Sequence, residues 1–180
     1  MILVFLGPPY SGKGIQAELL SKQLKIPVFS MGLLIRRAYE NKDPKIVKGY
    51  KQYALKGMHL PNKLKSHLLK KKLDENKGNF ILDNYPATKE DLDEFLNYLS
   101  KHFLQVDKVF YINISISEMK KRIVDRQRKD DKFDIVLKRR HIQDKDRIPV
   151  LAYFNSKGLL KEINGEGSIE DVYERIVKVL

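Results

Sequence analysis

The chain has 180 residues, of which 42% are apolar, and it contains no cysteine and no tryptophan. A chain of this length can bury one sizeable core, so we expect a single domain. The lack of cysteine excludes disulfides, a thiolate nucleophile and a cysteine-bound zinc ion. Lys and Arg number 35 against 23 Asp and Glu, a formal net charge of +12, which favours phosphate-rich partners: nucleotides, nucleic acid or a membrane surface.

The first apolar run, residues 1–6, is too short to span a bilayer, has no basic residues before it and ends at Gly7-Pro8-Pro9. We therefore expect a cytoplasmic protein with no membrane partner.

Short apolar runs predict the strands. Continuous apolar residues at 2–6, 80–82, 109–114 and, more weakly, 27–29 are typical of parallel strands covered on both faces, and 160–163 is a fifth candidate. Helical spacing predicts helices at 13–25, about 32–41, 44–56, 62–75, 89–103, 116–127, 132–157 and 169–180. Capping patterns at Thr88, Ser115 and Ser168 mark three of their starts. This alternation predicts an α/β fold that binds ligands at the carboxyl ends of its strands.

The first predicted strand is followed directly by Gly7-Pro8-Pro9-Tyr10-Ser11-Gly12-Lys13-Gly14, and a predicted helix opens there. A glycine loop in this context can cradle phosphates with backbone N–H groups, while the lysine reaches the β- and γ-phosphate oxygens. Gly14 and Ile15 follow Lys13, so the hydroxyl that usually stands there is missing. The alternative is an ordinary strand-to-helix turn with an exposed lysine.

The string GPPYSGKGIQAELL resembles the opening of the adenylate kinases and their nucleoside monophosphate kinase relatives, which typically reads GxPGxGKGTQ. The resemblance covers essentially the whole chain, through residues 29–36, 57–62, 80–86 and 128–131 and on to Arg139. It implies an α/β P-loop kinase fold with a central five-stranded parallel sheet flanked by helices and a short lid. The single domain 1–180 would comprise a core (1–30, 61–121 and 141–180), an acceptor-binding segment (31–60) and the lid (122–140).

Within this resemblance, ATP would contact a first set of residues: Pro9, Tyr10, Ser11, Gly12, Lys13, Gly14, Ile15, Arg122 and Arg126. Tyr10 stands where relatives have glycine, and it would be strained if that position needs a positive φ.

Asp83 follows the apolar run at 80–82, which places its carboxylate at the carboxyl edge of the predicted sheet. A carboxylate near a phosphate loop can hold Mg²⁺ through water, and the matching aspartate does so in the family. The alternative is an aspartate in a turn after a strand. We expect Mg²⁺ to accompany ATP.

Six of the nine arginines fall within 26 residues: Arg122, Arg126, Arg128, Arg139, Arg140 and Arg147. By resemblance, Arg122 and Arg126 match the pair that begins the family's lid, and Arg128 and Arg139 match the pair that ends it. Arg122, Arg128 and Arg139 would act with Lys13 in catalysis, because arginines stabilise the charge spread over a transferred phosphoryl group. The alternative is a solvated basic helix surface.

The resemblance places the acceptor nucleotide against a second set: Met31, Arg36, Met58, His59, Leu60, Asn84, Tyr85, Ala87, Asp91, Arg128 and Arg139. Met31 replaces a usual threonine, Ala87 replaces the arginine that grips the monophosphate, and Asp91 stands where a glutamine commonly reads adenine. Losing one phosphate contact of this kind costs about 2–4 kcal/mol in the transition state. Lys89 or Arg37 would be the compensating cation. Asp91 also fits a plain role, as third residue of a helix capped by Thr88.

The lysine-rich stretch at 63–72 carries leucines at helical spacing, which predicts an amphipathic helix with a solvated basic face. We do not expect nucleic acid as a partner, because no recognisable binding motif accompanies the lysines. The four histidines show no metal-ligand spacing. The leading hypothesis is a monomeric phosphotransferase that moves the γ-phosphoryl group of ATP to a nucleoside monophosphate, with AMP favoured by resemblance. The alternatives are a UMP/CMP-type kinase and a degenerate paralogue that binds nucleotide with little activity.

Overall fold

The computed structural model describes residues 1–126 and 133–180, without the side chains of residues 125 and 126. Strands and helices alternate in the order β1 (Ile2–Leu6), α1 (Lys13–Leu24), β2 (Val28–Ser30), α2 (Met31–Glu40), α3 (Pro44–Gln52), η1 (Ala54–Lys56), α4 (Asn62–Asn76), β3 (Phe80–Asp83), α5 (Lys89–Lys101), β4 (Lys108–Asn113), α6 (Ile116–Arg126), α7 (Phe133–Ser156), β5 (Leu160–Asn164) and α8 (Ile169–Val177). The helix predicted at 44–56 is divided into α3 and η1, because the backbone of Tyr53 leaves helical geometry at φ −120°.

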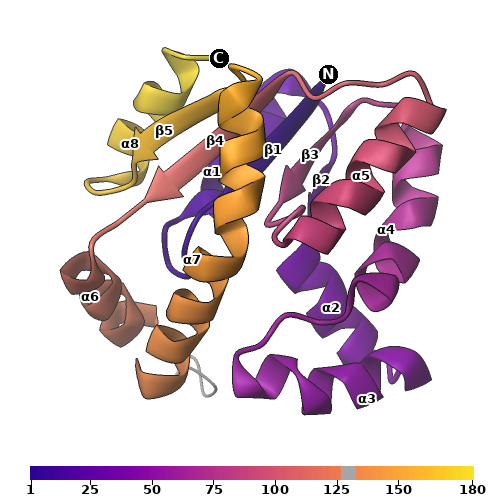
Figure 1. The fold of residues 1–180 in the computed structure, drawn as a ribbon. Coiled ribbons are helices and arrows are strands. Elements are labelled where there is room, and N and C mark those ends of the chain that lie inside the picture. Colours follow the sequence, from indigo (N-terminus) through magenta and orange to yellow (C-terminus); the bar gives the residue numbers. More distant parts are fainter. Residues whose placement is uncertain (127–132) are drawn as a thin grey trace.

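The five strands form one parallel sheet in the order β2-β3-β1-β4-β5. β1 lies at the centre, where Val4 is opposite Leu82 of β3 and Val109 of β4. This arrangement confirms the predicted fold class. Ligands of such sheets bind beyond the carboxyl ends of the strands, and the loop after β1 leaves the sheet at that edge (Figure 1).

Alternate residues of β1 face two separate cores, which is why its sequence is apolar throughout. Val4 and Leu6 pack in the core beneath α4, α5 and α7. Leu3 and Phe5 pack in the core beneath α1 and α8. All five residues of β1 are buried, so helices cover both faces of the sheet, as the continuous apolar run predicts.

α4 corrects one expectation about the lysine-rich stretch. Lys63, Lys70 and Lys71 are exposed, in agreement with a solvated basic face. Lys65 is not: its side chain is 3% exposed and occupies the same buried stripe as Leu69 and Leu73. A lysine is buried in this way when a carboxylate pairs with its charge, and Asp91 of α5 does so here.

Two groups of helices extend beyond the carboxyl edge of the sheet. α2 and α3 lie on one side, and α6 with the first turns of α7 lies on the other (Figure 1). A small third core of Ile114, Met119 and Val136 lies between α6 and α7, and the partly buried Tyr10 packs against it. In the part of the chain that the structure describes, no helix has the length and apolar character to cross a membrane.

Candidate active site

The loop between β1 and α1 has the strand–loop–helix geometry that its sequence predicts. Gly7 is required sterically, because a side-chain carbon there would collide with the carbonyl oxygen of Ile112. Gly12 adopts φ 85° just before α1 begins at Lys13. The Lys13 ammonium donates to the carbonyl oxygen of Pro8 at 3.2 Å. The first N–H groups of α1 therefore face a loop that a lysine closes, which is an arrangement suited to phosphate.

Tyr10 has a left-handed backbone conformation, with φ 65°. This is the positive φ that would strain a residue other than glycine at this position. A left-handed conformation costs a non-glycine residue about 1–2 kcal/mol. The tyrosine ring packs beside the small core between α6 and α7, and that burial offsets the cost. Tyr10 thus joins the phosphate loop to the helices that flank residues 127–132.

Asp83 ends β3 beside the loop and is 6% exposed. Its Oδ2 accepts a hydrogen bond from Ser30 Oγ at 2.6 Å, and it lies so close to Gly14 that a Cβ there would be 3.3 Å away. Its Oδ1 is buried and has no partner among the described residues. This free oxygen fits the role of a Mg²⁺ ligand. The described residues offer no cluster of three metal-binding side chains.

A central hollow of about 460 Å³ brings together groups from four elements. Lys13 and Asp83 lie on its wall, with Arg36 from α2 and Arg139 from α7. Pro9, Tyr10, Gly12, Gly14 and Ile15 of the predicted ATP set line it too. Glu18 of α1 is a second carboxylate on the wall. Three cationic side chains and two carboxylates at the carboxyl edge of a parallel sheet can hold several phosphates and a metal ion.

A second hollow, of about 540 Å³, lies beside the loop on the α6 and α8 side. Ser11 of the predicted ATP set belongs to it, and Ile15 and Ile169, each 47% exposed, lie on its wall. Arg122 donates to the carbonyl oxygens of Tyr10 at 3.1 Å and Gly165 at 2.8 Å, and to Glu118 at 2.8 Å. An apolar wall beside a phosphate site suits a flat base.

Sequence reasoning missed the turn that completes this second hollow. Gly165, Gly167 and Ser168 follow β5 and line it. Gly165 contributes its carbonyl oxygen, which accepts a hydrogen bond from Arg122. Every residue has a carbonyl oxygen, so the residue type at this position does not predict the contact. The usable signal was the Ser168–Asp171 capping box, which fixes where α8 begins.

A third hollow, of about 150 Å³, opens from the central one between α2, α3 and α4. Most of the predicted acceptor set lines it: Met31, Arg36, Met58, His59, Leu60, Asn84, Ala87 and Arg139. Tyr85 does not line it, because its ring is 3% exposed and packs edge-on against Phe95. Lys65 and Tyr50 line the hollow and were not predicted.

Asp91 is fully buried and faces Lys65 instead of the hollow. Its Oδ2 accepts from Lys65 Nζ at 2.6 Å and from the backbone N–H of Ala87 at 3.1 Å. Its backbone N–H also receives the Thr88 cap, so the plain helix-start role is present. Burial raises the pKa of Asp91, and the Lys65 charge opposes that rise. The Asp91 carboxylate therefore does not line the third hollow. It cannot contact a base there in the way that the resemblance implies for a glutamine at this position.

The two proposed replacements for the missing arginine lie elsewhere. Lys89 is exposed and pairs with Asp93 one turn along α5. Arg37 is exposed on α2. Neither lines the third hollow, whereas Lys65, Arg36 and Arg139 do.

The lid arginines are only partly described. Arg128 and the side chain of Arg126 lie outside the described residues. Arg139 packs beside Gly57, whose added Cβ would be 3.4 Å from Arg139 Cβ, and it faces both the central and the third hollow. The structure therefore describes the side chain of one arginine in each predicted lid pair, Arg122 in the first and Arg139 in the second.

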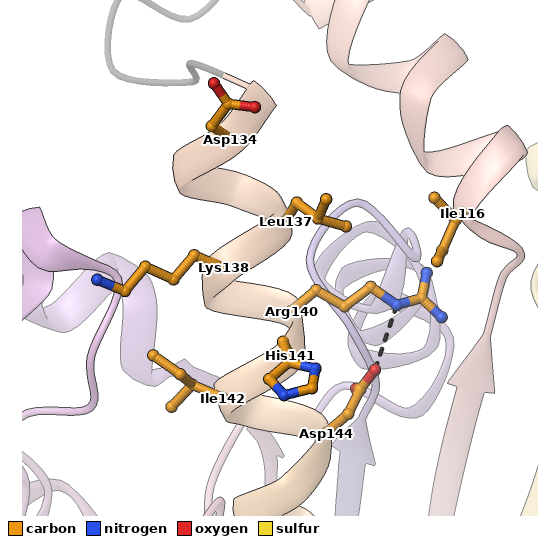
Figure 2. Close-up of a pocket in the computed structure, with 8 residues that line it drawn as sticks. All are labelled: Ile116, Asp134, Leu137, Lys138, Arg140, His141, Ile142 and Asp144. Atoms are coloured by element: carbon orange, nitrogen blue, oxygen red, sulfur yellow. Dashed lines mark hydrogen bonds and ion pairs between the residues drawn. The ribbon is translucent and has the colours of Figure 1, made fainter.

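The other two arginines of the run hold the base of α7. Arg147 is completely buried and donates to Gly7 O at 3.0 Å and to Asp144 at 2.8 Å. Arg140 donates to Ile114 O at 2.9 Å and pairs with the same aspartate, beside an open hollow of about 730 Å³ between α6 and α7 (Figure 2). The helix is thereby tied to the carboxyl ends of β1 and β4.

A phosphate loop, a carboxylate for a metal ion and convergent arginines on a doubly wound parallel sheet define a P-loop phosphotransferase. The family model described as adenylate kinase matches residues 5–159. The adenylate kinase of Mycobacterium leprae (strain Br4923) is 34% identical over 100% of this chain and 99% of its own. Those of Thermococcus onnurineus (strain NA1) and Leptospira biflexa serovar Patoc (strain Patoc 1 / Ames) are 30% and 29% identical, covering 99% and 98% of this chain and 93% and 97% of their own lengths.

The chain belongs to the adenylate kinase family. It is an ATP-dependent nucleoside monophosphate kinase, and its substrates are nucleotides.

Proposed function

We propose that this enzyme transfers the γ-phosphoryl group of ATP to AMP, giving two molecules of ADP. The observation that carries the proposal is the central hollow, where Lys13, Asp83, Arg36 and Arg139 line a space between a larger and a smaller side hollow. ATP would place its base in the larger hollow and its phosphates in the central one. The acceptor would enter the smaller hollow, with its phosphate directed to the centre. AMP is named because the similar proteins are called adenylate kinases.

Each described group has a part in this transfer. Lys13 and the N–H groups at the start of α1 would bind the donor phosphates. Arg36 and Arg139 would bind the acceptor phosphate and the transferred group, whose charge is spread over its equatorial oxygens. Asp83 would hold Mg²⁺ through water, and the ion supplies charge neutralisation at the β- and γ-phosphates when bound. Little covalent chemistry is required, because positioning and electrostatics lower the barrier.

The same reasoning gives the division of labour within the chain. Residues 31–60 would bind the acceptor and 122–140 would cover the donor, while the rest forms the core. We propose a monomer, because one chain supplies every group named above. The cytoplasm, where ATP and nucleoside monophosphates meet, is the compartment we propose.

A coupled assay of ADP formation with AMP, UMP and CMP in turn tests the proposal. We expect AMP to give the highest kcat/KM. UMP or CMP as the best acceptor would indicate a pyrimidine monophosphate kinase, an alternative that Ala87 and the buried Asp91 keep open. ATP binding without transfer to any monophosphate would indicate a degenerate paralogue.

A further inference from the structure

The third hollow has two distinguishable ends. Arg36, Asn84 and Arg139 line both this hollow and the central one, so they mark the end that adjoins the phosphate loop. Tyr50, Met58, His59, Leu60 and Lys65 line only the third hollow. If the proposed function holds, the acceptor phosphate must lie at the shared end, because its oxygen attacks the γ-phosphorus that Lys13 orients. The base of the acceptor then lies at the far end.

Lys65 is the charged group at that far end, among the described residues that line only this hollow. His59 is also there, but burial first, and the nearby Lys65 and Arg147 charges next, lower its pKa to about 3, so it is neutral near pH 7. Met58 and Leu60 are apolar. A base entering this end would meet an ammonium in largely apolar surroundings, where a hydrogen bond from a charged donor is strong.

Asp91 holds Lys65 from behind. The carboxylate does not line the hollow, yet its Oδ2 lies 2.6 Å from Lys65 Nζ and also accepts from the Ala87 N–H. One of the three ammonium N–H groups is directed to Asp91, and Asp91 is the acceptor that the structure describes for this lysine. The ammonium is therefore fixed at the wall with donor capacity left for a ligand.

An ammonium can donate hydrogen bonds but accepts none. Lysine accordingly pairs with the carbonyl oxygen and N7 of guanine, whereas adenine, which presents an amino donor beside its acceptor, is matched by an amide. Uracil resembles guanine here, since it presents a carbonyl oxygen. We infer that Lys65 is a specificity-determining residue that donates to a carbonyl oxygen of the acceptor base. It makes kcat/KM for the oxo bases of GMP and UMP higher, relative to AMP, than the same pocket would give without the lysine.

The experiment measures kcat/KM for AMP, GMP and UMP in the unaltered enzyme, in Lys65→Met and in Lys63→Met. Lys63 is exposed on the same helix and serves as the matched control. We expect Lys65→Met to lower the ratio of GMP or UMP to AMP by at least about tenfold, the effect of one good contact to a base. The GMP and UMP arms distinguish an oxopurine from an oxopyrimidine. Lys63→Met should leave both ratios unchanged.

Because Lys65→Met leaves a buried carboxylate without its partner, the double variant Lys65→Met/Asp91→Asn is measured as well, with the melting temperature of each protein. A lysine that merely joins α4 to α5 would lower stability and affect all three acceptors equally, so the ratios would not move. Unchanged ratios in folded double variant would overturn the inference. Transfer to none of the three monophosphates by the unaltered enzyme would overturn the proposed function and this inference with it.

Discussion

Lys13 lies at the junction of the phosphate loop and α1, of which it is the first residue. Its ammonium lies 3.2 Å from the carbonyl oxygen of Pro8 in the loop. Its charge is thus held over the concave side of the loop, where the donor phosphates would bind. Lys13 is not a member of the three apolar core clusters that the described residues form.

We predict that Lys13→Ala lowers kcat by at least about 10²–10³ while the melting temperature stays unchanged, because the lysine stabilises charge that develops in the transition state. Steady-state ADP formation and thermal unfolding measure the two quantities. The control is Lys22→Ala, because Lys22 is an exposed lysine on the same helix. Activity within about threefold of the parent would refute the role of Lys13.

Ala87 presents a different problem, since the family resemblance implies an arginine at this position. It lines the third hollow and is 1% exposed. We predict that Ala87→Arg raises kcat/KM for the true acceptor by at least about tenfold, or about 1.4 kcal/mol in the transition state. The measurement is acceptor saturation kinetics at fixed ATP.

The Ala87 experiment has its controls on the surface. Lys89 pairs with Asp93 and Arg37 is exposed, so Lys89→Ala and Arg37→Ala should leave the acceptor KM unchanged. A large loss in either variant would show that a surface cation moves in to replace the arginine. A neutral Ala87→Arg in folded protein would mean that Arg36 and Arg139 already supply the charge.

At the scale of elements, the hollows lie between helices that belong to different parts of the chain. The acceptor-side hollow of about 150 Å³ is smaller than the roughly 300 Å³ at which ligand sites begin. We therefore expect α2 and α3 to move apart when a nucleotide enters, and moving back would exclude water from the transferred group.

We predict that amide hydrogen exchange slows in residues 32–60 and 122–140 when a bisubstrate dinucleotide analogue binds. Closure over a ligand shields backbone N–H groups and suppresses local opening. Strand β1, all of which is buried, and the buried residues 109, 110 and 112 of β4 provide the internal control. Protection confined to residues 7–14 would contradict closure.

The elements differ in how far the sequence predicts them. β1 and the phosphate loop are predictable because a buried parallel strand leaves a continuous apolar run and the loop needs glycine at fixed positions. Lys65 is not, since its sequence neighbours are surface lysines and its partner Asp91 lies 26 positions away. Arg147 is likewise hard to tell from the other arginines of its cluster by sequence, although it is buried against Gly7. A partner far away in the sequence decides both cases: the Asp91 carboxylate for Lys65 and the Gly7 carbonyl oxygen for Arg147. No local pattern encodes such a contact.

For the whole molecule, His59 links stability to pH. Its folded pKa is lowered to about 3 from an unfolded value of 6.5, chiefly by burial. Above pH 6.5 the histidine is neutral in both states and costs nothing. As the pH falls below 6.5, the unfolded chain takes up a proton that the folded protein does not, so stability is lost progressively down to about pH 3.

The expected loss from His59 is about 2 kcal/mol between pH 8 and pH 5. Denaturant unfolding at the two pH values, in the parent and in His59→Gln, measures it as the difference between their pH dependences. The exposed His102 supplies the control variant His102→Gln, in which the same substitution is made at the surface. Equal slopes for parent and His59→Gln would show that the buried histidine titrates normally.

The two side hollows also differ in volume: the hollow beside α6 and α8 measures about 540 Å³, and the one between α2, α3 and α4 about 150 Å³. Arg122 ties the walls of the larger one together by its bonds to Tyr10 O and Gly165 O. Association with a site that already has its shape is faster than association that waits for a rearrangement. We therefore expect ATP to bind most molecules on encounter, and the monophosphate to bind only the fraction in which α2 and α3 have moved apart. The second-order association rate constant of the acceptor, rather than that of the donor, then depends on the fraction of molecules in the open conformation.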